Sequence, residues 1–189
     1  MNCGLRYLLN PSSTSSINAH HIHPWAHRFS NQRTTESLFR SVAVPDVLPR
    51  TSYRFVHTEG DFLQLTPPLR GGKEPGYDFI VTLFFIDTTS NVAAILEKIH
   101  ALLIPGGTWI NLGPLLWAGG GVVGLELSLN EVMDLAEMVG FQVHQSGGEE
   151  DKRRARTVPC LYTADKHVML KRIYDAQFWV ATKPNVLAA

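Results

Sequence analysis

The stretch FFIDTTSNVAAILEKIHALLIPGGTWINLGPLLW, residues 84–117, decides the fold. It overlaps the end of YDFIVTLFFI at 77–86, a nearly unbroken apolar run rich in β-branched and aromatic residues, which is typical of a strand buried on both faces. The polar residues at 88–91 are suitable helix caps. A buried strand is therefore followed by an amphipathic helix, whose apolar face consists of Ile95, Leu96, Ile99, Leu102 and Leu103.

The return to the sheet is equally plain in the sequence. Pro105-Gly106-Gly107 is expected to end the helix, and TWINLG at 108–113 is expected to be the next strand. Strand–helix–strand units with short connections join parallel strands. We therefore expect 79–86 and 108–112 to be parallel neighbours, with Asp87 at their carboxyl edge facing a cleft shared with Asp61.

Further elements are predicted on both sides of this unit. A second helix lies between a capping box at Ser128 and Glu131 and a terminal Gly140. Its apolar stripe consists of Val132, Leu135, Ala136 and Val139. Strands are predicted at YRFVH (53–57), FQVHQ (141–145) and AQFWVATK (176–183). The charge run EEDKRRAR (149–156) is expected to be a solvated loop rather than a binding patch.

The first part of the chain has a different composition. Residues 11–50 are rich in Ser, His and Pro and show few periodic apolar positions, so we expect loops and at most short helices. This predicts a loop- and helix-rich segment at 1–52, followed by the α/β part of the same domain at 53–189.

The bulk composition bounds the function. The chain has 189 residues, 44% of them hydrophobic, which suffices for one globular domain. Seventeen basic and seventeen acidic residues cancel, so no nucleic-acid or membrane partner is indicated. Cys3 and Cys160 make no disulfide framework, and no apolar run approaches the roughly 20 residues of a membrane helix. A cytoplasmic protein with small-molecule or protein partners is expected.

Two aspartates follow predicted strands, Asp87 after 77–86 and Asp61 after 53–57. Ligands of open α/β sheets bind outside the carboxyl ends of strands, where a carboxylate accepts hydrogen bonds from cationic or N–H-bearing groups. The alternative for Asp87 is a cap of the helix that starts near Ser90. For Asp61, the choice is between an adenine amino group as its partner and a plain turn aspartate beside a buried Phe62.

Histidines at 20, 21, 23 and 27 raise the question of a metal site. His23 and His27 have helical spacing, but Pro24 lies between them and no Cys or acidic ligand accompanies them. No metal is expected, and no nucleophile motif of a hydrolase is present.

Several segments together resemble the carnosine N-methyltransferase family, a branch of the class I S-adenosylmethionine-dependent methyltransferases. They are PWAHRFSNQR (24–33), PD (45–46), EGDF (59–62), VTLFFIDTTSNV (81–92) and IPGGTWINLGPLLW (104–117). The likeness runs from the first residues to ATKP at 181–184, and its longest block, 81–117, is the most specific.

The resemblance implies a fold and a reaction. The fold would be α/β, an incomplete part of the Rossmann-like, doubly wound, seven-stranded class I methyltransferase sheet, with an antiparallel last strand. The reaction would be methylation of an imidazole nitrogen of a histidine-containing dipeptide, carnosine to anserine, with S-adenosylmethionine as cofactor. A homodimer is an option for the assembly, and a nuclear location is an option beside the expected cytoplasmic one.

The resemblance also assigns roles to residues of this chain. Asp61 and Phe62 would contact the adenine part of the cofactor. Asp87 would be the catalytic residue and bind the substrate imidazole beside the transferred methyl, with Phe84 as a pocket wall. Tyr162 and Tyr174 would close over the substrate, and no metal is required.

This chain departs from the family pattern in two places. The family has a glycine-rich loop and an acidic residue upstream of the region seen here, whereas this chain begins later, with Asn2 near the position of the acid. The strand at 77–86 is then expected to lack one neighbour. After GPLL the family has a tyrosine and a substrate-contacting histidine, whereas Trp117 and Ala118 stand here. A non-catalytic remnant or interaction module is therefore the alternative to an enzyme.

Overall fold

The computed structural model describes residues 7, 16–27, 30–48, 55–72, 74–117, 125–145, 154–162 and 165–185. The chain divides into two compact units. The first combines Met1–Glu59 with Thr163–Arg172, and the second combines Gly60–Tyr162 with Ile173–Ala189. Residues 163–172 thus belong with the N-terminal segment although they lie late in the sequence. The division at residue 52 stays a prediction.

The first unit is mostly irregular where the structure describes it. Strands β1 (His20–Ile22) and β2 (Val42–Val44) pair antiparallel, and helix α2 (Thr35–Phe39) lies between them in the sequence. The side chain of Thr34 caps this helix by accepting a 3.1 Å hydrogen bond from the Ser37 N–H. The short helix agrees with the expected loops and short helices. The two strands were not expected, because three residues carry too little alternation to be recognised.

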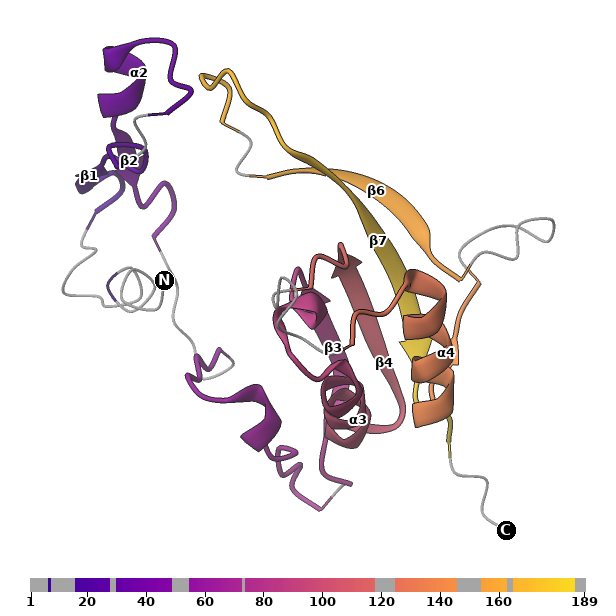
Figure 1. Cartoon of the computed structure of the whole chain (residues 1–189). Coiled ribbons are helices and arrows are strands. Elements are labelled where there is room, and N and C mark those ends of the chain that lie inside the picture. Colours follow the sequence, from indigo (N-terminus) through magenta and orange to yellow (C-terminus); the bar gives the residue numbers. More distant parts are fainter. Residues whose placement is uncertain are drawn as a thin grey trace. The chain divides into compact units, whose positions relative to one another are not determined.

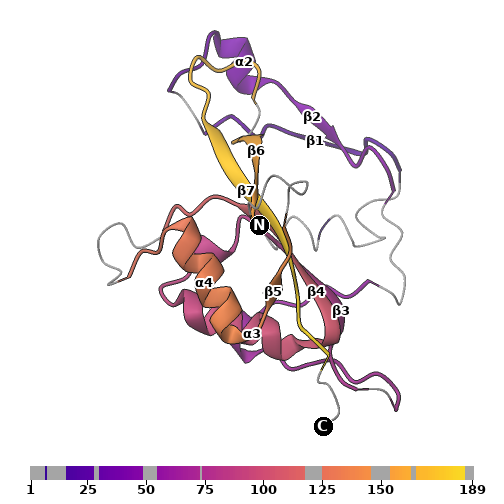
Figure 2. The ribbon, with the colours of Figure 1, turned by 90° about the vertical axis from the view of Figure 1, so that its right-hand side faces the viewer.

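The second unit contains a mixed five-stranded sheet with the order β3-β4-β7-β5, and β6 pairs with β7 off this path (Figures 1 and 2). Only β3 and β4 are parallel, whereas β7 is antiparallel to β4, β5 and β6. The fold is therefore mixed α/β with a largely antiparallel sheet. Its strands are β3 (Tyr77–Leu83), β4 (Leu103–Gly113), β5 (Gln142–Val143), β6 (Arg156–Leu161) and β7 (Ile173–Thr182).

The parallel pair confirms the predicted strand–helix–strand unit. Phe79 is opposite Thr108 and Leu83 is opposite Leu112, so the expected neighbours are paired. The role predicted for Pro105-Gly106-Gly107 is wrong, because the helix has already ended at Leu102 and these residues lie within β4. They form a bulge, across which the register moves from Tyr77 opposite Leu103 to Phe79 opposite Thr108.

Two helices of 11 residues each pack on the sheet, α3 (Val92–Leu102) and α4 (Leu129–Val139). Asn91 caps α3 by accepting a 3.1 Å hydrogen bond from the Ala94 N–H. Ser128 and Glu131 form the predicted capping box of α4, and Gly140 ends it in the left-handed conformation at φ 111°. None of the described helices is long and apolar enough to cross a membrane.

Both helices lie side by side on one face of the sheet (Figures 1 and 2). The core forms between them and that face, where Trp109 and Trp179 are each at most 1% exposed and their rings meet at 90°, 5.5 Å apart. The alternate residues of the strands point to the opposite face. Val81 of β3 there stays 67% exposed and Leu83 stays 62% exposed. The prediction that this strand is buried on both faces is therefore wrong.

Other strand predictions have mixed outcomes. Residues 55–57, the described part of YRFVH, are not a strand. FQVHQ contains the two-residue β5, and the last strand β7 begins earlier than predicted, at Ile173. Within the predicted charged loop, 149–153 lie outside the described residues, while Arg154 pairs with Asp134 at 2.8 Å.

Candidate functional site

Asp87 lies at the carboxyl edge of the parallel pair, as predicted. It belongs to a short 3₁₀ turn, η2 (Ile86–Thr88), that follows β3. Its side chain is buried, and Oδ2 accepts a 2.9 Å hydrogen bond from the N–H of Leu116, three residues beyond β4. The carboxylate therefore links the segments that leave the ends of both parallel strands.

The capping alternative for Asp87 is wrong. The N-cap of α3 is Asn91, whose side chain accepts the hydrogen bond from the Ala94 N–H. Among the described residues, Leu116 is the one donor to Asp87 outside its own backbone. Oδ1 of this buried carboxylate thus accepts no hydrogen bond from another residue in the described part of the chain.

Burial sets the protonation behaviour of this group. Removal from water raises the pKa of the Asp87 carboxyl above its ordinary value, and the hydrogen bond from Leu116 opposes the rise only in part. Perturbed carboxyls of this kind are common at functional sites, although structural ones also exist.

The raised pKa gives a testable pH dependence. A carboxyl whose pKa is higher in the folded than in the unfolded chain stabilises the fold fully below the unfolded pKa, and this contribution is lost as the pH rises through the folded pKa. Asp87→Asn keeps an oxygen for Leu116 without the charge. As the pH rises through the folded pKa of Asp87, the free energy of unfolding of Asp87→Asn should therefore increase relative to that of the unchanged protein. Urea unfolding at several pH values measures this difference. Asp175→Asn, which removes an exposed carboxylate, is the control. If the free energy of unfolding of Asp87→Asn changed with pH in parallel with that of the unchanged protein, the expectation would be contradicted.

Three of the residues assigned to the substrate form an aromatic row. The ring centroids of Phe84 and Tyr174 lie 5.7 Å apart, and those of Tyr174 and Tyr162 lie 5.9 Å apart, both in edge-to-face contact. Phe84 is also the third residue before Asp87. The structure therefore brings all the predicted substrate residues to one end of the sheet.

The backbone around Phe84 explains how its ring is aimed. Phe84 has a positive φ of 49°, and its N–H donates a 2.8 Å hydrogen bond to the carbonyl of Leu112. Glycine suits position 113, because a Cβ there would lie 3.2 Å from the Phe84 N and Cα atoms, a tight contact. A left-handed phenylalanine is unusual and marks a locally constrained conformation at the end of β3.

The two tyrosines lie on the hairpin formed by β6 and β7. Tyr174 is opposite Cys160 in the register, and Tyr162 directly follows the last residue of β6. Tyr162 is 50% exposed. A spacing of 12 residues in the sequence is converted by the hairpin into direct ring contact.

The predicted cofactor residues lie in a second short turn, η1 (Phe62–Gln64). Oδ1 of Asp61 accepts a 3.0 Å hydrogen bond from the Leu63 N–H, so the aspartate does cap a turn. Phe62 meets Phe85 edge to face at 5.0 Å, which places this turn beside the segment that carries Asp87. Asp61 is exposed, and its Oδ2 has no hydrogen-bond partner in the described parts of the chain. The shared cleft stays a prediction.

The segment after β4 holds residues whose roles were not foreseen. The backbone N–H of Leu116 orients Asp87, and backbone donors carry no signature in a sequence. Trp117 is 9% exposed, and its Nε1 donates a 3.0 Å hydrogen bond to the Leu127 carbonyl. It thereby ties the segment after β4 to the start of α4. Ala118 and Asn2 lie outside the described residues.

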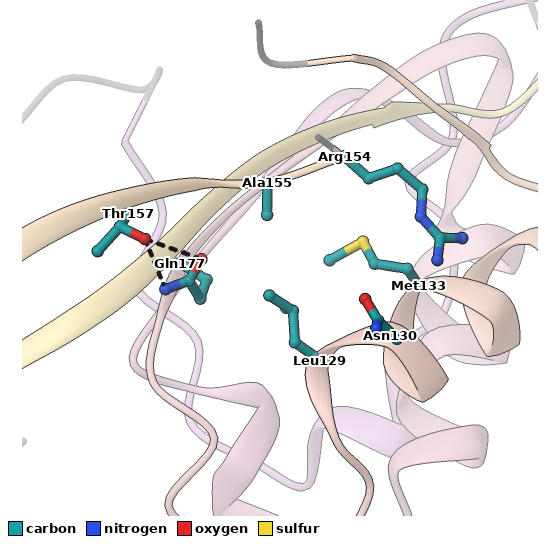
Figure 3. A pocket seen from close by; sticks show the side chains of 7 residues that line it. All are labelled: Leu129, Asn130, Met133, Arg154, Ala155, Thr157 and Gln177. Atoms are coloured by element: carbon teal, nitrogen blue, oxygen red, sulfur yellow. Dashed lines mark hydrogen bonds between the residues drawn. The ribbon is translucent and has the colours of Figure 1, made fainter. Parts of the chain in front are cut away.

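A separate cavity of about 610 Å³ lies where α4 begins, against the hairpin (Figure 3). None of the predicted site residues lines it. Thr157 and Gln177 are hydrogen-bonded to each other on one side, and Arg154 lies on another. Its full lining is Leu129, Asn130, Met133, Arg154, Ala155, Thr157 and Gln177.

Known proteins resemble this chain over most of its length. The family model for carnosine N-methyltransferase matches residues 1–185. The carnosine N-methyltransferase of Mus musculus is 34% identical over 177 residues, which cover 90% of this chain and 41% of that protein. The corresponding protein of Schizosaccharomyces pombe is 32% identical over 177 residues, covering 84% of this chain and 44% of its own.

A third relative agrees with these two. The Dictyostelium discoideum carnosine N-methyltransferase is 32% identical over 182 residues, covering 92% of this chain and 36% of its own. The chain thus spans about two fifths of the length of the curated relatives that it resembles. Because the family model accounts for nearly every residue and the relatives agree with it, the chain belongs to the carnosine N-methyltransferase family.

Proposed function

We propose that the protein acts as an S-adenosylmethionine-dependent N-methyltransferase that methylates an imidazole nitrogen of a histidine-containing dipeptide, converting carnosine to anserine. The observation that carries this proposal is the buried Asp87 carboxylate, fixed by Leu116, at the sheet edge that also carries the aromatic row of Phe84, Tyr174 and Tyr162. The Rossmann-like, doubly wound sheet is part of the proposal. The parallel pair crossed by α3 supports it.

Asp87 would orient the substrate ring. A neutral imidazole donates a proton from one nitrogen and offers a lone pair on the other. A carboxylate oxygen that accepts the N–H leaves the opposite nitrogen free to attack a methyl group and favours the imidazolium that forms. Because Leu116 already holds Oδ2, the carboxylate has one defined oxygen to offer and a fixed direction. Such positioning is the main catalytic requirement of an in-line methyl transfer.

The aromatic row would surround the ring. The rings of Phe84, Tyr174 and Tyr162 form a wall of edge-to-face contacts. Cation–π attraction to a developing imidazolium is worth about 0.5–2 kcal/mol for each ring that faces it. The wall also excludes water from the attacking nitrogen.

The residues present fit part of the cofactor. Oδ2 of Asp61 is an uncommitted acceptor, suitable for the amino group of an adenine, and the half-buried ring of Phe62 lies next to it in the sequence. When bound, S-adenosylmethionine supplies an electrophilic methyl group. Asp61 and Phe62 would hold its adenine end, and Asp87 and the tyrosines would hold the dipeptide.

The proposal is tested with the full-length protein. Methyl transfer to carnosine should be observed, with β-alanyl-alanine as the control dipeptide that lacks the imidazole. Product analysis should find the methyl group on an imidazole nitrogen. Transfer to the terminal amino group of the dipeptide instead, or equal reactivity of the control dipeptide, would contradict the proposed role of Asp87.

The alternative is a non-catalytic interaction module. Strand β3 ends the sheet and has a neighbour only on the β4 side within the described residues. Its outward side chains are apolar and exposed, a pattern that marks interaction surfaces. A protein that binds neither S-adenosylmethionine nor carnosine in calorimetric titrations would favour this alternative.

A further inference from the structure

The tip of the β6–β7 hairpin belongs to the first unit, whereas its two strands belong to the second. Within the first unit, the tip is fastened to the N-terminal segment by main-chain contacts. The N–H of Met169 donates a 2.8 Å hydrogen bond to the Asn31 carbonyl, and Gln32 forms an antiparallel bridge with Val168. Residues more than a hundred positions apart in the sequence are thereby joined.

A partly buried ion pair completes this attachment. Nη2 of Arg40 lies 2.6 Å from Oδ1 of Asp165, whose side chain is 3% exposed. The same oxygen accepts a 2.9 Å hydrogen bond from the His167 N–H, so it also shapes the turn of the tip. Oδ2 of Asp165 has no hydrogen-bond partner in the described residues, so Arg40 is the one side chain that satisfies this carboxylate.

Arg40 is itself held in place. It follows the last residue of α2, and its Nη1 donates to the carbonyl of Ser37. The guanidinium lies 3.4 Å above the ring centroid of Trp25. A planar guanidinium that is stacked on one side and bonded at two nitrogens has a single orientation, which a lysine cannot reproduce.

The segment held by this ion pair lies in the sequence directly between the two tyrosines assigned to the substrate. Asp165 is the third residue after Tyr162, and Tyr174 is the second residue after Arg172, the last residue of the tip. We propose that Arg40 and Asp165 are a positioning pair that fixes the hairpin tip and thereby holds the rings of Tyr162 and Tyr174 in register for the dipeptide. The catalytic part of this inference rests on the proposed function, whereas the positioning of the rings does not.

The first test reads the tyrosine rings directly and needs no activity. In full-length protein labelled with 3-fluorotyrosine, with signals assigned by Tyr→Phe variants, Asp165→Asn and Arg40→Lys should shift or broaden the fluorine signals of Tyr162 and Tyr174. Amide exchange at His167 and Met169 should also become about tenfold faster or more. Arg70→Gln, which breaks an exposed ion pair with Asp78, is the matched control and should change neither. Unchanged tyrosine signals in both variants would overturn the proposal.

The second test separates positioning from a merely structural role. Asp165→Asn should weaken carnosine binding by about tenfold while the affinity for S-adenosylhomocysteine stays within about twofold of its starting value. Equal losses for both ligands would overturn the proposal, because general destabilisation lowers both. If the unchanged protein binds no carnosine, the proposed function fails, and the fluorine signals alone decide whether the pair positions the tyrosines.

Discussion

Asp87→Asn should lower the rate of carnosine methylation by about 10²-fold or more, while the affinity for S-adenosylmethionine stays near its starting value. The reason lies in the fixed donor on one side of the group. The Leu116 N–H requires an oxygen, so an asparagine must turn its oxygen to Leu116 and its NH₂ group to the substrate. A donor then faces the imidazole N–H, where an acceptor is needed. Methyl-transfer kinetics and cofactor titration, both on the full-length protein, measure the two quantities.

Asp61→Ala provides the reciprocal control. It removes the acceptor assigned to the adenine and should weaken the cofactor first, with a smaller effect on the rate at saturating cofactor. It also removes the cap of η1, although Asp61 itself is exposed. Asp61→Asn keeps an oxygen for Leu63 and separates these two effects. An Asp87→Asn protein with an unchanged rate would leave Asp87 as a purely structural link between the two strand ends.

The local patterns of the fold could be predicted because each rests on neighbours in the sequence. The capping box at Ser128 and the glycine at 140 are bonded within one or two turns of α4, and both were recognised. The burial of β3 could not be predicted in the same way. An apolar run shows that a strand can be buried, but it does not show whether another layer of the protein covers each face. The Pro-Gly-Gly bulge in β4 likewise depends on the register with β3, which no local pattern encodes.

The candidate site also combines features that local sequence patterns predict with features that they do not. The position of Asp87 after a predicted strand was enough to place it at the carboxyl edge. Its partner is a backbone N–H some thirty residues away, and the contact between Tyr162 and Tyr174 depends on a hairpin of which only the second strand was predicted. The family resemblance supplied the tyrosines, and the structure supplies their contact. Long-range pairing is therefore the part that residue patterns alone did not reach.

The face of the sheet opposite α3 and α4 has its own consequence for behaviour in solution. The register aligns Val81 with Ile110 and Val180 in one row, and Leu83 with Leu112 and Phe178 in the next. The residues of β3 in these rows are exposed, and the others are half-buried. At the outer side of β3, backbone groups lack a strand partner within the described residues. An apolar face beside an open edge favours pairing with a second molecule.

The chain of residues 1–189 should therefore self-associate, and Val81→Lys combined with Leu83→Lys should suppress this. Burial of each of these side chains in a contact is worth roughly 1.5–3 kcal/mol, so their replacement by charges should weaken association by at least about tenfold. Sedimentation velocity over a concentration series measures the effect. Leu69→Lys combined with Met138→Lys removes two exposed apolar side chains, 91% and 83% accessible, that belong to neither of these rows, and serves as the matched control. The charged variant leaves the backbone edge of β3 intact. It therefore also tests whether this edge alone is enough for two molecules to pair. A monomeric and cooperative thermal transition of the unchanged chain would show that the exposed rows carry no association at all.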